Sequence, residues 1–410
     1  MTTQKLPEID ILRIISILIV IIAIHIPLSY AYNFYFDLDQ YGVFLVNNVG
    51  IFVSMGSFVF VSGFGLYLNP NNRNLNSSEK IFSFLKKRLI RIFPLYWIAI
   101  ILFIIFVGYS DIDPLYLMFH FLGLQIIVAP YFGAPMLTLW FIGVIMIYYY
   151  IYIIINYLGS IKLIIPASMV ILLFFLILNG IFGLVESRFF LYYLLFILGI
   201  TTAHIYTSSF YKNVKDRLKS IKPVILLLVP LCCAFLGLIA LTFLTQLCFS
   251  TFNPDFLRYI LARKPGRLFF LTITFSSSLF FQLATVILLL NLIMIFFILF
   301  SISSFSFVFR TFGLIFTKRK LESAVAITAY STYSAYLFHR VFLTVFVAIL
   351  TIALNLNMLE LDNFYLVLLF VPFILIFSFL IQKAYDMICK SVPKFVNKYN
   401  LKLVFKKSSK

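Results

Sequence analysis

Residues 8–27, EIDILRIISILIVIIAIHIP, form an almost continuous apolar run with an arginine near one end and a histidine near the other. A run of this length can cross the hydrocarbon core of a bilayer as a single helix. A charged side chain inside such a helix costs at least about 2.5–3.5 kcal/mol on insertion scales. Arg13 and His25 therefore need an explanation, which we sought in the rest of the chain.

Similar apolar runs recur along almost the whole chain of 410 residues, which is 63% hydrophobic and only 11% charged. Soluble globular proteins do not have this composition, and barrel strands would show short alternating segments instead. We predict an all-α polytopic membrane protein, a bundle of about ten transmembrane helices in one integral-membrane domain (residues 1–390) with a basic tail (391–410). The expected spans are roughly 9–30, 41–68, 93–108, 137–158, 161–179, 188–206, 223–249, 270–300, 324–354 and 364–389.

Two further features concern short segments. The run Leu115–Ala129, which contains His120, is marginal for a span, and a re-entrant or interfacial helix is expected there. The four cysteines lie in or beside apolar segments without the spacing of a metal site or a disulfide framework, so we infer neither. They are Cys232, Cys233, Cys248 and Cys389.

The net charge of +18 is explained by topology rather than by nucleic-acid binding. With both termini in the cytoplasm, the segments after spans 2, 6 and 8 and the C-terminal tail lie on the cytoplasmic side of the cell membrane. These segments are basic, as the positive-inside rule requires. One loop, 251–267, is basic although it should lie outside; it is either an interfacial loop or a site for an anionic ligand. The loops expected outside carry Asp37, Asp39, Asp111, Asp113, Glu360 and Asp362.

A second histidine lies in the ninth span, in the segment AYSTYSAYLFHR (329–340). His339 and His25 lie at similar distances from the starts of spans that both run outward, so we expect the two imidazoles at a similar depth. Each could be a packing residue, but a matched pair with polar neighbours fits a proton-handling site better. These neighbours are Ser331, Thr332, Tyr333, Ser334 and Tyr336.

Basic residues also cluster just before the third span, in FLKKRLIRIFPLYW (84–97). Arg88 and Arg91 are three residues apart, and Lys87 and Arg91 are four apart, so on a helix each pair shares a face. The cluster is either a positive-inside anchor or a phosphate clamp, because paired arginines bind phosphate in a fork geometry that lysine cannot copy.

Five segments together resemble the acyltransferase family 3 membrane proteins and occur in the order expected of that family. The resemblance extends from about residue 8 to residue 345. The segments are LRIISILIVIIAIH (12–25), FVFVSGFGLYL (58–68), KRLIRIFPLYW (87–97), LWFIGVIMIYYYIYII (139–154) and YSTYSAYLFH (330–339).

The resemblance implies a membrane O-acyltransferase that moves an acyl group, commonly acetyl, from cytoplasmic acyl-CoA to a hydroxyl of an extracytoplasmic carbohydrate or glycolipid. Acyl-CoA would be a co-substrate, with no bound cofactor and no metal. Arg13, His25 and His339 match the family's functional positions. Arg88 and Arg91, with Lys87 beside them, would contact the donor. We expect Trp140, Ser62, Tyr336 and Ser331 to line the pocket or the acceptor side.

The chain departs from the family pattern at two places. The family usually has ten residues between the first arginine and histidine, which leaves the two about 20° apart on an α-helix. Here eleven intervene, so Arg13 and His25 would lie about 120° apart unless a π-bulge restores the register. The segment after Trp140 also lacks the acid that many members carry there, and Asp111 and Asp113 are replacements by location only.

Two other functions fit the same residues. A proton-coupled transporter or flippase of a lipid-linked saccharide would bind a diphosphate in a basic cavity and use the histidines to couple protons. A relative without catalytic activity is also compatible with the unusual spacing of Arg13 and His25. For an acyltransferase, no Ser-His-Asp or Cys-His arrangement is evident, so we expect direct transfer with His25 as general base rather than a serine acyl-enzyme. An acyl intermediate on His25 is the alternative.

Overall fold

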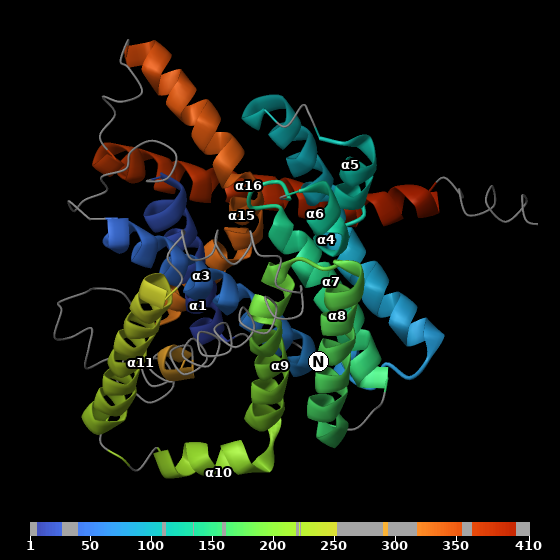
Figure 1. Cartoon of the computed structure of the whole chain (residues 1–410), viewed down its shortest axis with the longest axis vertical. Coiled ribbons are helices and arrows are strands. Elements are labelled where there is room, and N and C mark those ends of the chain that lie inside the picture. The colour runs from blue at the N-terminus through green and yellow to red at the C-terminus, as the bar shows by residue number, and fades with distance from the viewer. Residues whose placement is uncertain are drawn as a thin grey trace, which may run out of the picture.

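The computed structural model of the chain describes residues 6–26, 40–108, 112–133, 135–157, 161–218, 221, 223–251, 290–293, 318–354 and 363–398. This part of the chain consists of helices and their connections and contains no β-strand, which confirms the all-α class (Figure 1). The basic loop 251–267 beyond Thr251, the tail beyond Lys398 and nearly all of the eighth predicted span lie outside the described residues, as do Pro27, Asp37, Asp39, Asp111, Glu360 and Asp362.

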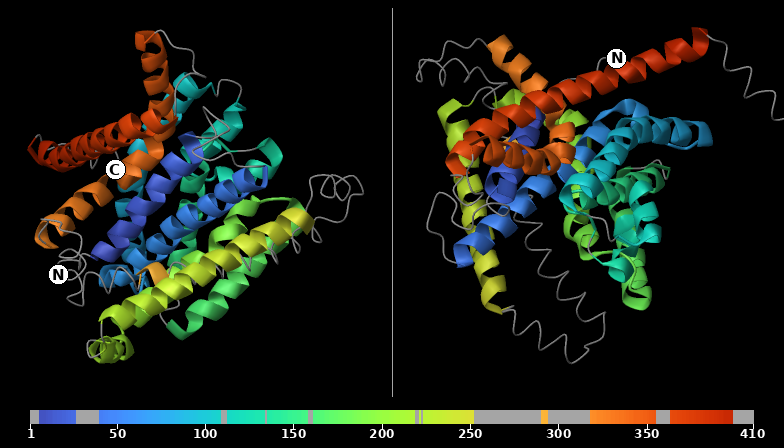
Figure 2. Two further views of the ribbon diagram at one scale, coloured as in Figure 1. Left: turned by 90° about the vertical axis from the view of Figure 1, so that its left-hand side faces the viewer. Right: turned by 90° about the horizontal axis from the view of Figure 1, so that it is seen from above.

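The N-terminal helices are α1 (Pro7–Leu18), the π-helix η1 (Ile19–His25), α3 (Gln40–Leu68), the 3-10 turn η2 (Pro70–Asn72) and α4 (Ser78–Val107). The middle of the chain contains α5 (Pro114–Phe121), α6 (Gln125–Phe132), α7 (Trp140–Tyr157), η3 (Ile161–Leu163), α8 (Ile164–Phe182), α9 (Ser187–Thr207), α10 (Ser209–Leu218) and α11 (Pro223–Thr251). The long helices α15 (Lys318–Leu354) and α16 (Asn363–Lys398) follow, and Figure 2 shows α16 extending along one edge of the molecule.

Seven of the described helices are long and apolar enough to cross a membrane. They agree with seven of the ten predicted spans. The first predicted span is divided between α1 and η1, and the described apolar part of α11 (Leu227–Ala240) is shorter than a span. The seven are 50–68, 78–107, 140–157, 164–182, 187–207, 322–353 and 366–389.

The run 115–129 does not form a span. It divides into α5 and α6, which meet near Gly123, where φ is +68°, in the left-handed region that favours glycine. The prediction of a non-spanning segment is confirmed. Asp113 caps the first of these helices, because its carboxylate accepts hydrogen bonds from the amides of Leu115 and Tyr116 at 2.8 and 3.1 Å.

The centre of the bundle is built where α3 crosses α9, and two glycines allow the backbones to touch. A Cβ atom added at Gly63 would lie 2.3 Å from the carbonyl oxygen of Phe196, and one added at Gly199 would lie 2.2 Å from that of Phe60. Any larger side chain would separate the helices, which is why small residues favour close helix packing in membranes. This crossing holds α3 in place as one wall of the site described below.

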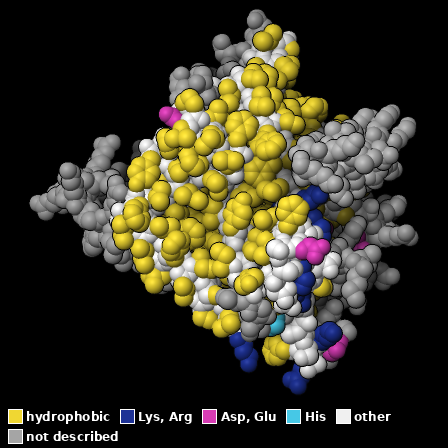
Figure 3. Space-filling model, turned by 90° about the vertical axis from the view of Figure 1, so that its right-hand side faces the viewer, with side chains coloured by type: hydrophobic (Ala, Val, Ile, Leu, Met, Phe, Trp, Pro, Cys, Tyr) yellow, Lys and Arg dark blue, Asp and Glu magenta, His cyan; other side chains and the backbone are white. Residues whose placement is uncertain are grey.

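The outer surface is apolar over a wide area. Helix α8 exposes large apolar side chains, which include Val170, Leu173, Phe174 and Ile181. Figure 3 shows this apolar face, with lysine and arginine side chains along its right-hand and lower edges. An exposed apolar face of this extent is typical of a helix bundle surrounded by lipid.

Candidate active site

The first span changes helix type between Arg13 and His25. Residues 7–18 form the α-helix α1, and Ile19–His25 continue it as a π-helix, in which the hydrogen bonds join residues five apart. A π-helix has more residues per turn than an α-helix, so each of its residues turns the chain through a smaller angle. The π-helical segment therefore reduces the separation of about 120° that eleven intervening residues would give the two side chains on a regular α-helix.

His25 and His339 meet in the interior. Nδ1 of His25 lies 2.8 Å from Nε2 of His339, and the ring centroids are 4.7 Å apart. His339 is fully buried on α15. The expected common depth of the two histidines is therefore confirmed, and their contact joins the first span to α15 across 314 residues of sequence.

The neighbours of the pair decide where its hydrogens lie. Nδ1 of His339 is 2.8 Å from the carbonyl oxygen of Tyr336 and 3.1 Å from that of Ala335, and a carbonyl can only accept, so this nitrogen carries hydrogen. In a neutral ring, Nε2 of His339 is then an acceptor, and Nδ1 of His25 must donate to it. In this tautomer Nε2 of His25 carries the lone pair of the ring and can accept a proton.

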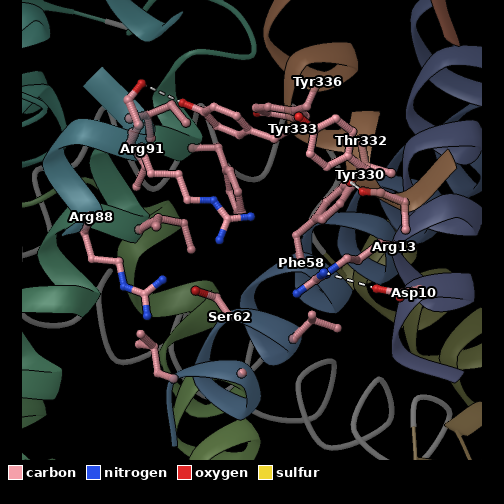
Figure 4. A pocket seen from close by; sticks show the side chains of 18 of the residues that line it. Asp10, Arg13, Phe58, Ser62, Arg88, Arg91, Tyr330, Thr332, Tyr333 and Tyr336 are labelled. Atoms are coloured by element: carbon pink, nitrogen blue, oxygen red, sulfur yellow. Dashed lines mark hydrogen bonds and ion pairs between the residues drawn. The ribbon is translucent and has the colours of Figure 1, made fainter. Parts of the chain in front are cut away.

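A cavity of about 470 Å³ lies beside this pair, between α1, α3, α4, α7 and α15. The expectation that Arg88 and Arg91 share one helix face is confirmed, because both line it from α4, and Arg13 lines it from α1. Figure 4 shows the three guanidinium groups pointing inward from opposite walls. Of the other predicted residues, Ser62 and Tyr336 also line the cavity.

The charge of the cavity is positive. Asp10 is the one acid among the lining residues, and it accepts a hydrogen bond of 3.3 Å from Nη1 of Arg13. Arg91 lies close enough to Arg13 for their charges to repel each other. Nε of Arg88 is buried without a hydrogen-bond partner, while its guanidinium group lies over the rings of Phe84 and Tyr149 at 5.4 and 5.8 Å. Arginines grouped in this way have the charge and the donor groups to bind an anion.

Lys87 and Ser331 do not line the cavity. Lys87 is exposed, because it lies on another face of α4 from Arg88 and Arg91. Ser331 is buried, and its hydroxyl donates to the carbonyl of Thr328 at 2.8 Å within its own helix. Of the basic cluster 84–97, the two arginines line the cavity and Lys87 does not.

Trp140 also lies outside the cavity lining, but its contacts bring an acid near it from another helix. The guanidinium carbon of Arg188 is 4.8 Å from the centre of the Trp140 ring, and Nε of Arg188 donates to Glu186 at 2.6 Å. Burial raises the pKa of Glu186, and the neighbouring Arg188 opposes this rise. Asp113, one of the replacements proposed by location, caps α5 instead.

Several residues of the site were not predicted from the sequence. Asp10 precedes Arg13 by one helical turn, so helix spacing could have indicated it. Phe58, Phe141 and Tyr149 line the cavity as part of long apolar runs, in which no pattern marks them. Whether these residues line the cavity depends on which face of their helix packs toward α4.

His120 has a structural role. Its Nδ1 lies 3.0 Å from the carbonyl of Tyr116, and its Nε2 accepts a hydrogen bond of 3.2 Å from the amide of Met136. Burial lowers the pKa of this histidine, which keeps the ring neutral with both nitrogens engaged. His120 therefore ties α5 to the segment before α7.

Comparison with known proteins gives one match. A family model described as an acyltransferase domain, Acyl_transf_3, matches residues 6–383, which include every residue of the cavity and of the histidine pair. Comparisons with curated proteins and with solved structures gave no match.

Proposed function

The chain belongs to this acyltransferase family, and on that premise we propose that it transfers an acyl group from acyl-CoA to a hydroxyl group of a carbohydrate or glycolipid on the far side of the membrane. The family supports a membrane acyltransferase in general. One observation carries the more specific proposal, namely that a cavity lined by three arginines adjoins a pair of hydrogen-bonded histidines.

The donor would occupy the cavity with its phosphates on Arg13, Arg88 and Arg91. These arginines come from the ends of α1 and α4 that the charge distribution assigns to the cytoplasm, where acyl-CoA is available. A phosphate on these groups would offset their mutual repulsion and give the buried Nε of Arg88 an acceptor. The arm of the donor would then lead its thioester along the cavity toward the histidines.

His25 acts as the general base in this mechanism. Its Nε2 takes the proton of the acceptor hydroxyl, whose oxygen attacks the thioester carbonyl carbon. The new carbon–oxygen bond forms and the carbon–sulfur bond breaks, which leaves an ester and a CoA thiolate. The thiolate takes the proton from His25 and leaves as free CoA. His339 is a positioning residue that keeps the hydrogen of His25 on Nδ1 throughout.

This proposal is tested with the full chain purified into liposomes, radiolabelled acetyl-CoA and a panel of glycan and glycolipid acceptors. We expect label in at least one acceptor and an increase in melting temperature on addition of CoA. Absence of both results would overturn the proposal. A saccharide transporter would instead move its substrate without acyl-CoA, so transport is measured in the same liposomes.

The donor site can be tested separately, because arginine and lysine carry the same charge. The double variant Arg88→Lys/Arg91→Lys is expected to bind CoA about tenfold more weakly, since lysine cannot form the two-pronged contact with phosphate. The dissociation constant for CoA is measured by titration calorimetry in detergent. Lys87→Ala is the matched control, and it should bind CoA like the wild type because Lys87 is exposed outside the cavity. Equal affinity in the double variant would mean that the two arginines only anchor the helix.

A further inference from the structure

Three aromatic rings close one end of the cavity. Phe58 on α3, Phe141 on α7 and Tyr336 on α15 all line it, and their ring centroids lie 5.3 Å (Phe141–Tyr336), 6.0 Å (Phe58–Tyr336) and 6.1 Å (Phe58–Phe141) apart. Each ring therefore contacts the other two. We refer to these three residues as the aromatic wall.

The aromatic wall lies at the opposite end of the cavity from Arg88. One face of α7 follows the cavity from Phe141 through Ile145 to Tyr149, which at 1.5 Å per residue spans about 12 Å. Arg88 lies over the ring of Tyr149, at the far end of that face. The lining thus changes from arginine to apolar rings along the length of the cavity.

The aromatic wall also lies next to the histidine pair. The ring of Tyr336 lies 6.1 Å from that of His339, which does not line the cavity itself. The hydroxyl of Tyr336 donates to the backbone carbonyl of Thr138, so the ring is held at its far end as well as at its backbone. Thr138 is itself buried, with φ at +58° in the left-handed region.

We propose that the acyl group of the donor packs against the aromatic wall and that the wall restricts it to acetyl or propionyl. This inference rests on the proposed function, since it assumes an acyl-CoA donor with its phosphates on the arginines. A thioester that reaches past the apolar part of the cavity meets three packed rings, and its acyl group fills the space beside them. A longer chain would have to displace rings that pack on one another and, for Tyr336, are fixed by a hydrogen bond.

The test compares the affinities of acetyl-CoA, butyryl-CoA and hexanoyl-CoA for the full chain purified in detergent, by titration calorimetry. The wild type is expected to bind butyryl-CoA and hexanoyl-CoA at least about tenfold more weakly than acetyl-CoA, the effect typical of one or more surplus methylenes in a closed apolar pocket. Phe141→Ala and Phe58→Ala should each remove most of this discrimination.

Phe60→Ala is the matched control, because Phe60 is two residues from Phe58 on α3 and is fully buried away from the cavity. It should keep the wild-type preference. If an alanine variant does not fold, Phe141→Leu removes less volume and should raise the relative affinity for butyryl-CoA in the same direction.

Three results would be decisive against the inference. A wild type that binds all three thioesters equally, or wall variants that discriminate like the wild type, would overturn it while leaving the donor site intact. A wild type that binds no form of CoA would overturn the proposed function, and the inference with it. The affinity for CoA alone thus separates the two failures.

Discussion

Replacing His25 with alanine is expected to lower kcat for acyl transfer by about 10²–10⁴-fold, the usual contribution of a general base. In the proposed mechanism Nε2 is the nitrogen of this ring that can act as the base, because Nδ1 is occupied by the contact with His339. The donor should still bind, since its phosphates contact the arginines and not the histidine. The measurements are single-turnover transfer from radiolabelled acetyl-CoA and the dissociation constant for CoA.

His204→Ala serves as the control for His25→Ala. Nδ1 of His204 lies 3.2 Å from the hydroxyl of Tyr67, at the end of α3 that leads into η2, and this histidine does not line the cavity. Its variant should transfer acyl groups at the wild-type rate. A His25→Ala protein that is folded, binds CoA and keeps kcat within a few-fold of the wild type would contradict the assignment of the base.

Changes at His339 should separate a positioning role from a packing role. His339→Leu fills a similar space but offers no acceptor, so the hydrogen of His25 is no longer held on Nδ1, and we expect kcat to fall by about 10²-fold or more. His339→Gln can place its amide oxygen where Nε2 of His339 lies and accept that hydrogen. It is expected to recover a substantial part of the lost rate.

The readout for this pair is the split between kcat and KM for acetyl-CoA, together with melting temperature. A positioning residue changes kcat with little effect on KM, because it does not touch the donor. Equal rates for the leucine and glutamine variants would show that His339 supports the site by packing alone. If kcat falls in proportion to the melting temperature of each variant, whatever the side chain at position 339, the conclusion is the same.

Much of the fold follows from the sequence because hydrophobicity acts locally. Every stretch of about 20 apolar residues must satisfy its backbone hydrogen bonds within itself when lipid surrounds it, and helices do so. Seven predicted spans correspond to helices that meet this requirement. The shared face of Arg88 and Arg91 also follows from local geometry, since residues three apart in a helix lie side by side.

The register of the first span could not be derived in this way. Eleven residues between Arg13 and His25 are compatible with a regular helix that turns the two apart, and with a π-helix that brings them together. A π-helix is intrinsically unfavourable, so it forms where tertiary contacts stabilise it. Here the side chain of His25, at the end of η1, contacts His339 on α15. The π-helix is the device that the unusual spacing of Arg13 and His25 calls for, and whether the chain is active stays a question for the transfer assay.

Trp140, Lys87 and Ser331 show the same limit at the level of single residues. All three lie in segments that the sequence analysis singles out, yet none lines the cavity. Lys87 lies on a different face of α4 from the two arginines, and Trp140 contacts Arg188 and Tyr192 instead. Conversely, Phe58 and Phe141 line it although nothing in their apolar surroundings distinguishes them.

The sequence by itself determined that this protein is a helical membrane bundle of the acyltransferase family, with arginines and histidines inside it, because burial in lipid and helix periodicity act over a few residues at a time. Only the tertiary structure decided which of these side chains meet. The contact between His25 and His339, the three arginines around one cavity and the aromatic wall at its end all depend on how separate helices rotate and pack against one another. That packing is settled by the whole bundle at once, through contacts between residues hundreds of positions apart.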